Sequence, residues 1–160
     1  MRLIIAAVGR LKDGAERELL ERYRNRFAGM AKRLGFAPVA WHELAESRAA
    51  TASKRSSEEG AQLLRLSRGA DVIIALDERG KALTSQAFAQ LLARTRDNGA
   101  GTAAILVGGA DGLAPAVREA AQVKVSFGAI TLPHGLARIV LAEQLYRAAT
   151  ILAGHPYHRD

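Results

Sequence analysis

The sequence contains no cysteine. Disulfide bonds, thiolate metal sites and a cysteine nucleophile are therefore excluded, and the chain suits a reducing compartment. Aromatic residues make up only 5% of the chain, whereas 49% of its residues are hydrophobic. A core of this kind consists of Val, Ile, Leu and Ala rather than stacked rings, which favours an α/β protein over an aromatic-rich sandwich.

Long hydrophobic runs are absent as well. The apolar stretch within residues 1–8 ends at Gly9 and is too short for a signal peptide or a membrane span. We therefore expect a soluble, cytoplasmic protein. A chain of 160 residues also fits a single domain, which we expect to cover residues 1–160.

Acidic residues are in the minority. The chain has 16 Asp and Glu against 23 Lys and Arg, giving a formal net charge of +7 and a pI near 10.4. A protein of this charge attracts phosphate-rich polymers before any specific contact forms, so nucleic acid is a candidate partner. Basic surfaces also occur without such a partner, and the charge alone leaves both interpretations open.

Several sequence motifs that mark common enzymes are missing. The chain has no G-x-G-x-x-G followed by an acidic residue about 20 positions later, no P-loop and no G-x-S-x-G, so dinucleotide, nucleotide and hydrolase chemistry lack support. His155 and His158 lie three residues apart, but their surroundings do not match known zinc-ligand spacings. We expect no metal site.

Strand-like and helix-like segments alternate along the chain. This alternation predicts an α/β fold with a mainly parallel sheet and helices on both faces. We expect strands at 2–8, 38–44, 71–76, 102–107 and 123–127, and helices at 15–34, 56–67 and 137–153 with a further helix carrying Phe88, Leu91 and Leu92. We also expect a mobile loop at 45–57, a capping box of Ser56 with Glu59, and a turn from Asp77 to Lys81.

Three loops are placed to form a site, since ligands of open α/β sheets gather at the carboxyl ends of strands. They follow Leu76, Val107 and Phe127. The glycines at 108, 109 and 112 would let backbone approach a ligand closely, or they form only a tight turn before a helix.

Polar side chains are concentrated near the C-terminus. Glu143 and Arg147 are spaced as a helical i, i+4 pair, which on its own is also typical of an ordinary surface salt bridge. The other members of this group are Thr131, Pro133, His134, Arg138, Gln144, Tyr146 and the run His155-Pro156-Tyr157-His158-Arg159.

Five motifs occur along the chain in this order: Leu76-Asp77-Glu78-Arg79-Gly80-Lys81, Val107-Gly108-Gly109-Ala110-Asp111-Gly112-Leu113, Thr131-Leu132-Pro133-His134, Glu143-Gln144-Leu145-Tyr146-Arg147-Ala148 and His155-Pro156-Tyr157-His158-Arg159. Through them the chain resembles, over its whole length, the RlmH family, the large-subunit rRNA pseudouridine N3-methyltransferases of the SPOUT class. Two departures from the family's usual pattern are Gly135, where a larger residue is common, and Gly128, where Ser is common.

The resemblance implies a C-terminal trefoil knot, a homodimer and S-adenosylmethionine as cofactor, with 23S rRNA in the assembled ribosome as substrate. Carried over position by position, it places one set of residues around the cofactor: Leu76, Gly108, Gly128, Ala129, Ile130, Thr131, Leu132 and Pro133. The alternatives are an RNA-binding or ribosome-binding module without activity, and a SPOUT methyltransferase that acts on tRNA.

The chemistry of N3 methylation suggests which C-terminal residues act. Loss of the N3 proton places negative charge on two carbonyl oxygens, which a nearby cationic or polar donor stabilises. Arg147, Tyr157 and His158 are the candidates, with Glu143 orienting Arg147. The sequence leaves open which group removes the proton.

The first helix carries a basic face that would hold rRNA phosphates, unless it is only a solvated surface. Its cations, with those just before and after it, are Arg10, Lys12, Arg17, Arg22, Arg24, Arg26, Lys32 and Arg33.

Overall fold

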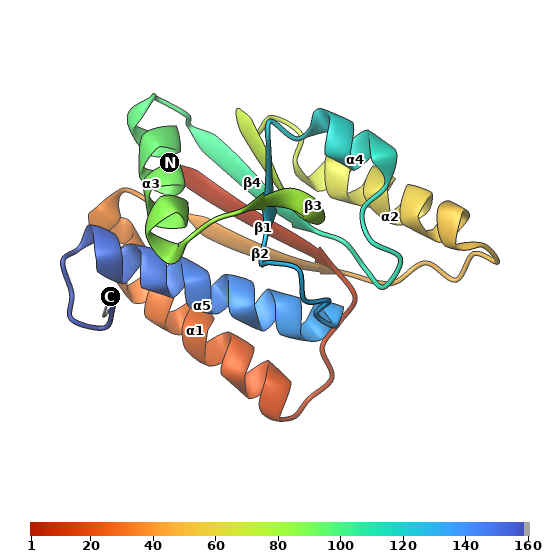
Figure 1. The fold of residues 1–160 in the computed structure, drawn as a ribbon, viewed down its shortest axis with the longest axis horizontal. Coiled ribbons are helices and arrows are strands. Elements are labelled where there is room, and N and C mark those ends of the chain that lie inside the picture. The colour runs from red at the N-terminus through yellow and green to blue at the C-terminus, as the bar shows by residue number, and fades with distance from the viewer. Residues whose placement is uncertain (159–160) are drawn as a thin grey trace.

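The computed structural model describes residues 1–158 and contains one five-stranded sheet in the order β2-β1-β4-β3-β5 (Figure 1). Every neighbouring pair of strands is parallel, so the mainly parallel α/β sheet expected from the sequence is confirmed. The elements are β1 (Arg2–Val8), α1 (Ala15–Ala31), η1 (Lys32–Leu34), β2 (Val39–Leu44), α2 (Ala52–Leu66), β3 (Val72–Ala82), α3 (Ser85–Asp97), β4 (Thr102–Val107), α4 (Pro115–Ala120), β5 (Val123–Ser126) and α5 (His134–Leu152).

Helices cover both faces of the sheet, as the sequence predicts. Because successive side chains of a strand point to opposite faces, β1 supplies two separate layers. Leu3 and Ile5 pack into a core that includes residues of α1, α3 and α5, whereas Ile4 and Ala6 pack into a second core with residues of α2 and α4. Because both faces of the sheet are buried, the sequences of the central strands are continuous apolar runs.

The loop expected at 45–57 is wrong in its second half, because α2 begins at Ala52. The Thr51 hydroxyl caps the helix by accepting a hydrogen bond from an N–H of its first turn. Ser56 lies inside the helix, and the capping box that it was expected to form with Glu59 is therefore also wrong. The Glu59 carboxylate instead accepts a hydrogen bond from the Ser47 N–H at 2.8 Å.

The turn expected from Asp77 to Lys81 is part of an irregular strand. Leu76 and Lys81 both pair with Val125, so the four residues between them bulge out of the ladder. A Cβ on Gly80 would lie 2.7 Å from backbone atoms of Val125, and only glycine allows β3 to pass so close to β5. This close passage is compatible with the implied knot, which stays a prediction.

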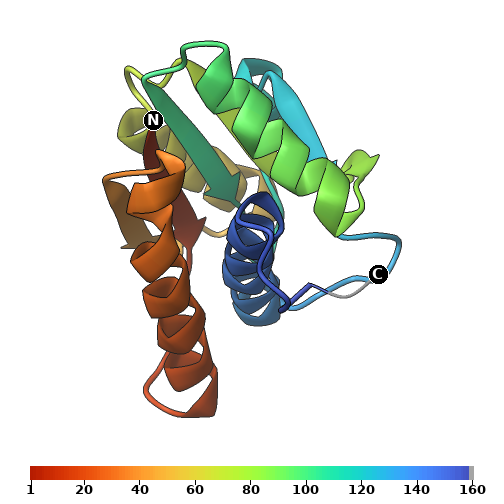
Figure 2. The same cartoon turned by 90° about the vertical axis from the view of Figure 1, so that its left-hand side faces the viewer.

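The helix expected at 137–153 begins three residues earlier, at His134, and is the C-terminal part of the core. Figure 2 shows α5 between α1 and α3, both of which it contacts. Leu141 and Leu145 are almost completely buried there. No helix within residues 1–158 is long and apolar enough to cross a membrane.

Candidate functional site

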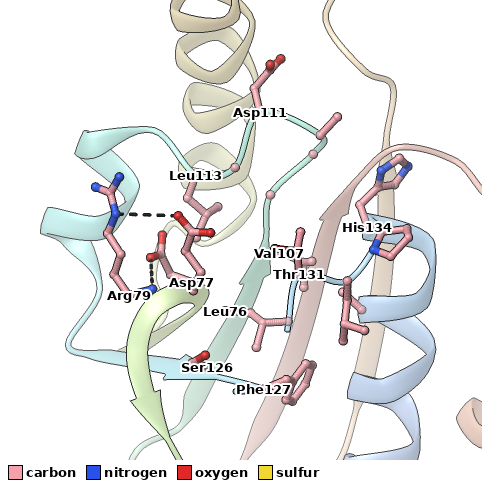
Figure 3. A pocket seen from close by; sticks show the side chains of 18 of the residues that line it. Leu76, Asp77, Arg79, Val107, Asp111, Leu113, Ser126, Phe127, Thr131 and His134 are labelled. Carbon is pink, nitrogen blue, oxygen red and sulfur yellow. Dashed lines mark hydrogen bonds and ion pairs between the residues drawn. The ribbon is translucent and has the colours of Figure 1, made fainter. Parts of the chain in front are cut away.

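The three strand-end loops meet in one pocket of about 680 Å³ (Figure 3). Parallel strands bring their carboxyl ends to the same edge of the sheet, which is why segments distant in sequence converge here. Its volume falls within the range of about 300–1,000 Å³ typical of small-molecule sites. The lining combines apolar side chains (Leu76, Val107, Leu113 and Phe127) with polar ones and exposed backbone.

The glycine-rich loop after β4 forms one wall. A Cβ on Gly108 would lie 2.7 Å from the carbonyl carbon of Gly112, and Gly112 itself has φ +75°. A Gly109–Gly112 bridge closes the turn. The geometry of the turn therefore requires glycine at position 108. The backbone of this turn faces the pocket.

Residues of α2 and the segment before it anchor this loop from outside. The Arg55 guanidinium forms two hydrogen bonds to the Asp111 carboxylate, at 2.7 and 3.1 Å, and a third to the Ala49 carbonyl. Hydrogen bonding to Arg55 lowers the pKa of Asp111 below its ordinary value. Sequence reasoning did not find this pair, because its members are 56 positions apart.

Asp77 is the buried acid of the pocket. Its side chain is 5% exposed and accepts hydrogen bonds from the Arg118 Nε at 2.7 Å and from the Arg79 N–H at 2.9 Å. Asp77 thus holds the bulge of β3 against α4. The charged motif after Leu76 contained this residue, but nothing in the sequence indicated its partner.

The loop from Gly128 to Pro133 forms the opposite wall. Gly128 has φ +108°, and its N–H donates to the Ser126 hydroxyl. Seven of the eight residues expected around the cofactor line the pocket. The eighth, Ala129, belongs to the same loop but is not among the pocket-lining residues.

His134, the first residue of α5, also lines the pocket and was not among the expected site residues. Its Nε2 lies 3.2 Å from a Glu46 carboxylate oxygen. One turn later the buried Arg138 donates to the Gly9 carbonyl at 2.8 Å and to Glu43 at 2.9 Å. The start of α5 therefore contacts residues at the end of β2 and residues just after β1 and β2.

A separate group of side chains, the C-terminal cluster, contains three of the expected catalytic residues: Glu143, Arg147 and Tyr157. Glu143 accepts hydrogen bonds from Arg147 at 2.9 Å and from the Tyr157 hydroxyl at 3.3 Å, and the Arg147 guanidinium lies 5.1 Å from the Tyr157 ring centre. The rings of Tyr146 and Tyr157 contact each other in a tilted arrangement, with centres 4.7 Å apart and planes at 58°. Burial, followed by a hydrogen bond with Tyr23 and the charge of Glu143, raises the pKa of Tyr157 to about 12. His158 follows this tyrosine and is half-buried, whereas Arg159 lies outside the described residues.

The two groups of residues lie toward opposite ends of α5. At about 1.5 Å per residue, the helix rises about 20 Å between His134 and Arg147. The structure therefore brings the expected cofactor residues together and the expected catalytic residues together, but does not bring the two groups to one place within a chain.

The arginines of α1 are not equivalent. Arg22 and Arg26 are exposed, whereas Arg24 is half-buried over the Trp41 ring, and Arg17 is paired with Glu43. Within residues 1–158, no group of three or more His, Cys, Asp or Glu side chains is arranged to hold a metal ion.

The chain is similar to known proteins over its full length. A family described as predicted SPOUT methyltransferase matches residues 1–158. Ribosomal RNA large subunit methyltransferase H of Nitrobacter winogradskyi is 54% identical over 159 residues, covering 99% of both chains. The protein of the same name from a Bradyrhizobium species is 52% identical over the same length and coverage. A probable methyltransferase from Bordetella pertussis has a solved structure that covers 92% of this chain and 95% of its own, with 19% identity and a TM-score of 0.48.

Proposed function

We propose, because the chain belongs to the RlmH family of SPOUT methyltransferases, that it methylates N3 of a pseudouridine in 23S rRNA of the assembled ribosome. The observation that carries this proposal is the match of more than half of all residues over 159 positions to large-subunit rRNA methyltransferases. The resemblance inferred from the five motifs is thereby confirmed at the level of the family.

The pocket fits S-adenosylmethionine. The cofactor supplies an activated methyl group on a sulfonium, and a mixed apolar and polar lining suits its rings, hydroxyls and charged end. In our proposal the backbone of the 108–112 turn and of the 128–133 loop holds the cofactor, while Leu76 and Phe127 cover its flat apolar parts.

The C-terminal cluster acts on the pyrimidine. Arg147 is a permanent cation held in place by Glu143, and it stabilises negative charge on the carbonyl oxygens beside N3. With its pKa raised to about 12, Tyr157 keeps its hydroxyl proton at neutral pH and serves as a donor or a stacking surface rather than as a base. His158 adjoins it in the same segment.

A homodimer explains how the two groups of residues meet. Since α5 separates them by about 20 Å within a chain, we infer that each protomer offers its C-terminal cluster to the pocket of the other. Ile130 and Leu136, 81% and 41% exposed, are the large hydrophobic side chains exposed on the described chain and flank the start of α5. Apolar side chains in such a position suit a contact with a second copy.

The test is mass spectrometry of 23S rRNA from cells with and without the gene, followed by complementation. We expect one pseudouridine to lose one methyl group in the deletion strain, and purified protein with S-adenosylmethionine to restore it on intact ribosomes. An unchanged pattern of rRNA methylation would contradict the proposal. A missing methyl group in tRNA instead would assign the enzyme to a different substrate.

A further inference from the structure

His134 lies at the pocket, whereas the residues of the C-terminal cluster in the same chain do not. It lines the pocket within the same chain as the cofactor loops, and its side chain is 33% exposed, so a substrate can reach it. Figure 3 shows it at the start of α5, beside the loop that carries Thr131. None of the roles assigned above uses its imidazole.

The backbone of Gly9 makes room for a pair formed by His134 and Glu46. A Cβ on Gly9 would lie 3.1 Å from ring atoms of His134 and 3.1 Å from the Glu46 oxygen, and the φ of Gly9 is +92°. The backbone conformation therefore requires glycine, and a side chain there would also crowd the imidazole and the carboxylate.

The helix turn that carries His134 is fixed independently. Arg138 is 2% exposed, and besides Gly9 and Glu43 its guanidinium donates to the His134 carbonyl at 3.3 Å. The charged groups that act on the Arg138 guanidinium come from two elements and one loop: Glu16 and Arg17 of α1, Glu43 of β2 and Glu46 after β2. These contacts fix the backbone of the turn that carries His134, and Glu46 is the charged side chain that contacts the ring itself.

Glu46 also favours one tautomer. A carboxylate oxygen 3.2 Å from Nε2 favours a proton on that nitrogen. The neutral ring then presents Nδ1 as a hydrogen-bond acceptor. The group that must be removed from the pyrimidine, the N3–H, is a donor, so the two are complementary.

We propose that His134 is the base that accepts the N3 proton of the pyrimidine, with Glu46 as its positioning residue; this rests on the proposed function. The proton moves from N3 to Nδ1 of His134, and the electron pair of the broken N–H bond forms the new N–CH₃ bond. The electron pair of the cleaved S–CH₃ bond stays on sulfur, and the imidazolium later releases its proton to water. Of the other candidates, Tyr157 is protonated and Glu143 already accepts from Arg147, so His158 is the remaining competitor of His134 for this role.

The tautomer can be measured without cofactor or RNA. In full-length protein labelled with ¹⁵N-histidine, the His134 ring should show the Nε2–H form at the pH where it is neutral, and Glu46→Gln should abolish this preference. His134→Gln identifies the signal by its loss. An Nδ1–H tautomer in the wild-type protein would overturn the proposal.

Single-turnover methylation of ribosomes tests the role in catalysis. Because a general base contributes about 10²–10⁴-fold, His134→Gln should lower the rate by at least about 100-fold while S-adenosylmethionine affinity stays near that of the wild type. The rate of the wild type should rise with pH along an acid limb that is missing in His134→Gln, and imidazole should partly restore the rate of His134→Ala. His42→Gln, which changes a histidine of β2 outside the pocket, is the matched control and should keep the wild-type rate.

The outcomes separate this inference from the function on which it rests. If the wild type methylates 23S rRNA and His134→Gln does so at the same rate with the same acid limb, the base lies elsewhere and the function stands. If the wild type methylates no rRNA, the proposed function fails, whatever tautomer the imidazole shows.

Discussion

At Gly108, a single methyl group is already too large for the turn that follows β4. Valine at this position would press its Cβ against the Gly112 backbone at 2.7 Å, and overpacking of this kind costs about 1–3 kcal/mol. We therefore expect Gly108→Val to weaken S-adenosylmethionine binding by at least about tenfold, because the loop reshapes. Isothermal titration calorimetry measures the affinity, and thermal melting measures the stability.

Gly29→Ala is the control for this substitution. Gly29 lies in α1, and a Cβ there would have no neighbour within 4 Å. Alanine should stabilise the helix by about 0.5–1 kcal/mol and leave cofactor binding unchanged. Equal cofactor affinity in Gly108→Val and Gly29→Ala would place the cofactor away from the glycine turn.

Arg147 is a second residue whose role can be isolated. Arg147→Ala should lower the methylation rate by about 10²–10³-fold, the usual effect of removing one donor to developing negative charge, with little change in cofactor affinity. Arg147→Lys keeps the charge but loses the planar fork that holds Glu143 and covers the Tyr157 ring, so we expect only partial recovery. A full rate in Arg147→Ala, measured on ribosomes, would remove this residue from the catalytic group.

Residues whose role follows from their place in the chain could be predicted, and residues whose role depends on a distant partner could not. The meeting of the loops after Leu76, Val107 and Phe127 was predictable because the carboxyl ends of parallel strands lie at one edge of the sheet. The choice of individual cofactor residues came from the family resemblance. The role proposed for His134 was not predictable, because it depends on Gly9 and Glu46, which lie far away in the sequence. The sequence contained every one of these residues but not their pairing.

Among the elements, α1 together with the short helix η1 that continues it allows the clearest test of RNA binding. Arg22→Gln with Arg33→Gln removes two exposed cations at little cost to packing. If both contact phosphates, affinity for ribosomes should fall, and the slope of log K against log salt should decrease by about 1 for each. Arg24 is unsuitable for this test, because it packs on Trp41 and pairs with Glu21.

The matched control removes the same charge on the other face of the sheet. Arg65 and Arg68 are exposed at the end of α2 and just after it. Their replacement by Gln should leave the salt slope unchanged. If both double variants bind ribosomes like the wild type, α1 is a solvated surface.

The ends of helices were likewise predictable where the local sequence decides them and unpredictable where distant contacts also act. The helices with strong apolar periodicity, α1 and α3, were predicted, whereas the start of α2 was placed at Ser56 instead of Ala52. Thr51 and Ser56 are both acceptable N-caps by local chemistry. Contacts with distant segments, such as that of Arg55 with Asp111, also act on this region, and a local pattern does not contain them.

At the scale of the whole molecule, a shared site predicts complementation between two inactive variants. Gly108→Val damages the pocket and Arg147→Ala damages the C-terminal cluster, so a mixed dimer keeps one intact pocket facing one intact cluster. Random exchange of equal amounts should restore about a quarter of the wild-type activity, since half of the dimers are mixed and each has one working site.

Light scattering of the wild type provides the companion measurement. We expect twice the mass of the 17.1 kDa chain at micromolar concentration. A monomer would contradict the shared site, and a dimer whose mixed variants stay inactive would show that each protomer uses its own cluster.

The position of α5 also sets the order in which the protein can mature. This helix is the last element of the chain, yet Leu141 and Leu145 fill the same core as Leu3 and Phe27 from its beginning. Before α5 is in place, the part of α1 that contacts it is uncovered, and the contacts that close the core span nearly the whole sequence. Such long-range contacts are slow to form, so folding is completed only after synthesis. A chain that lacks α5 therefore cannot close this core, whatever the order in which its other elements form.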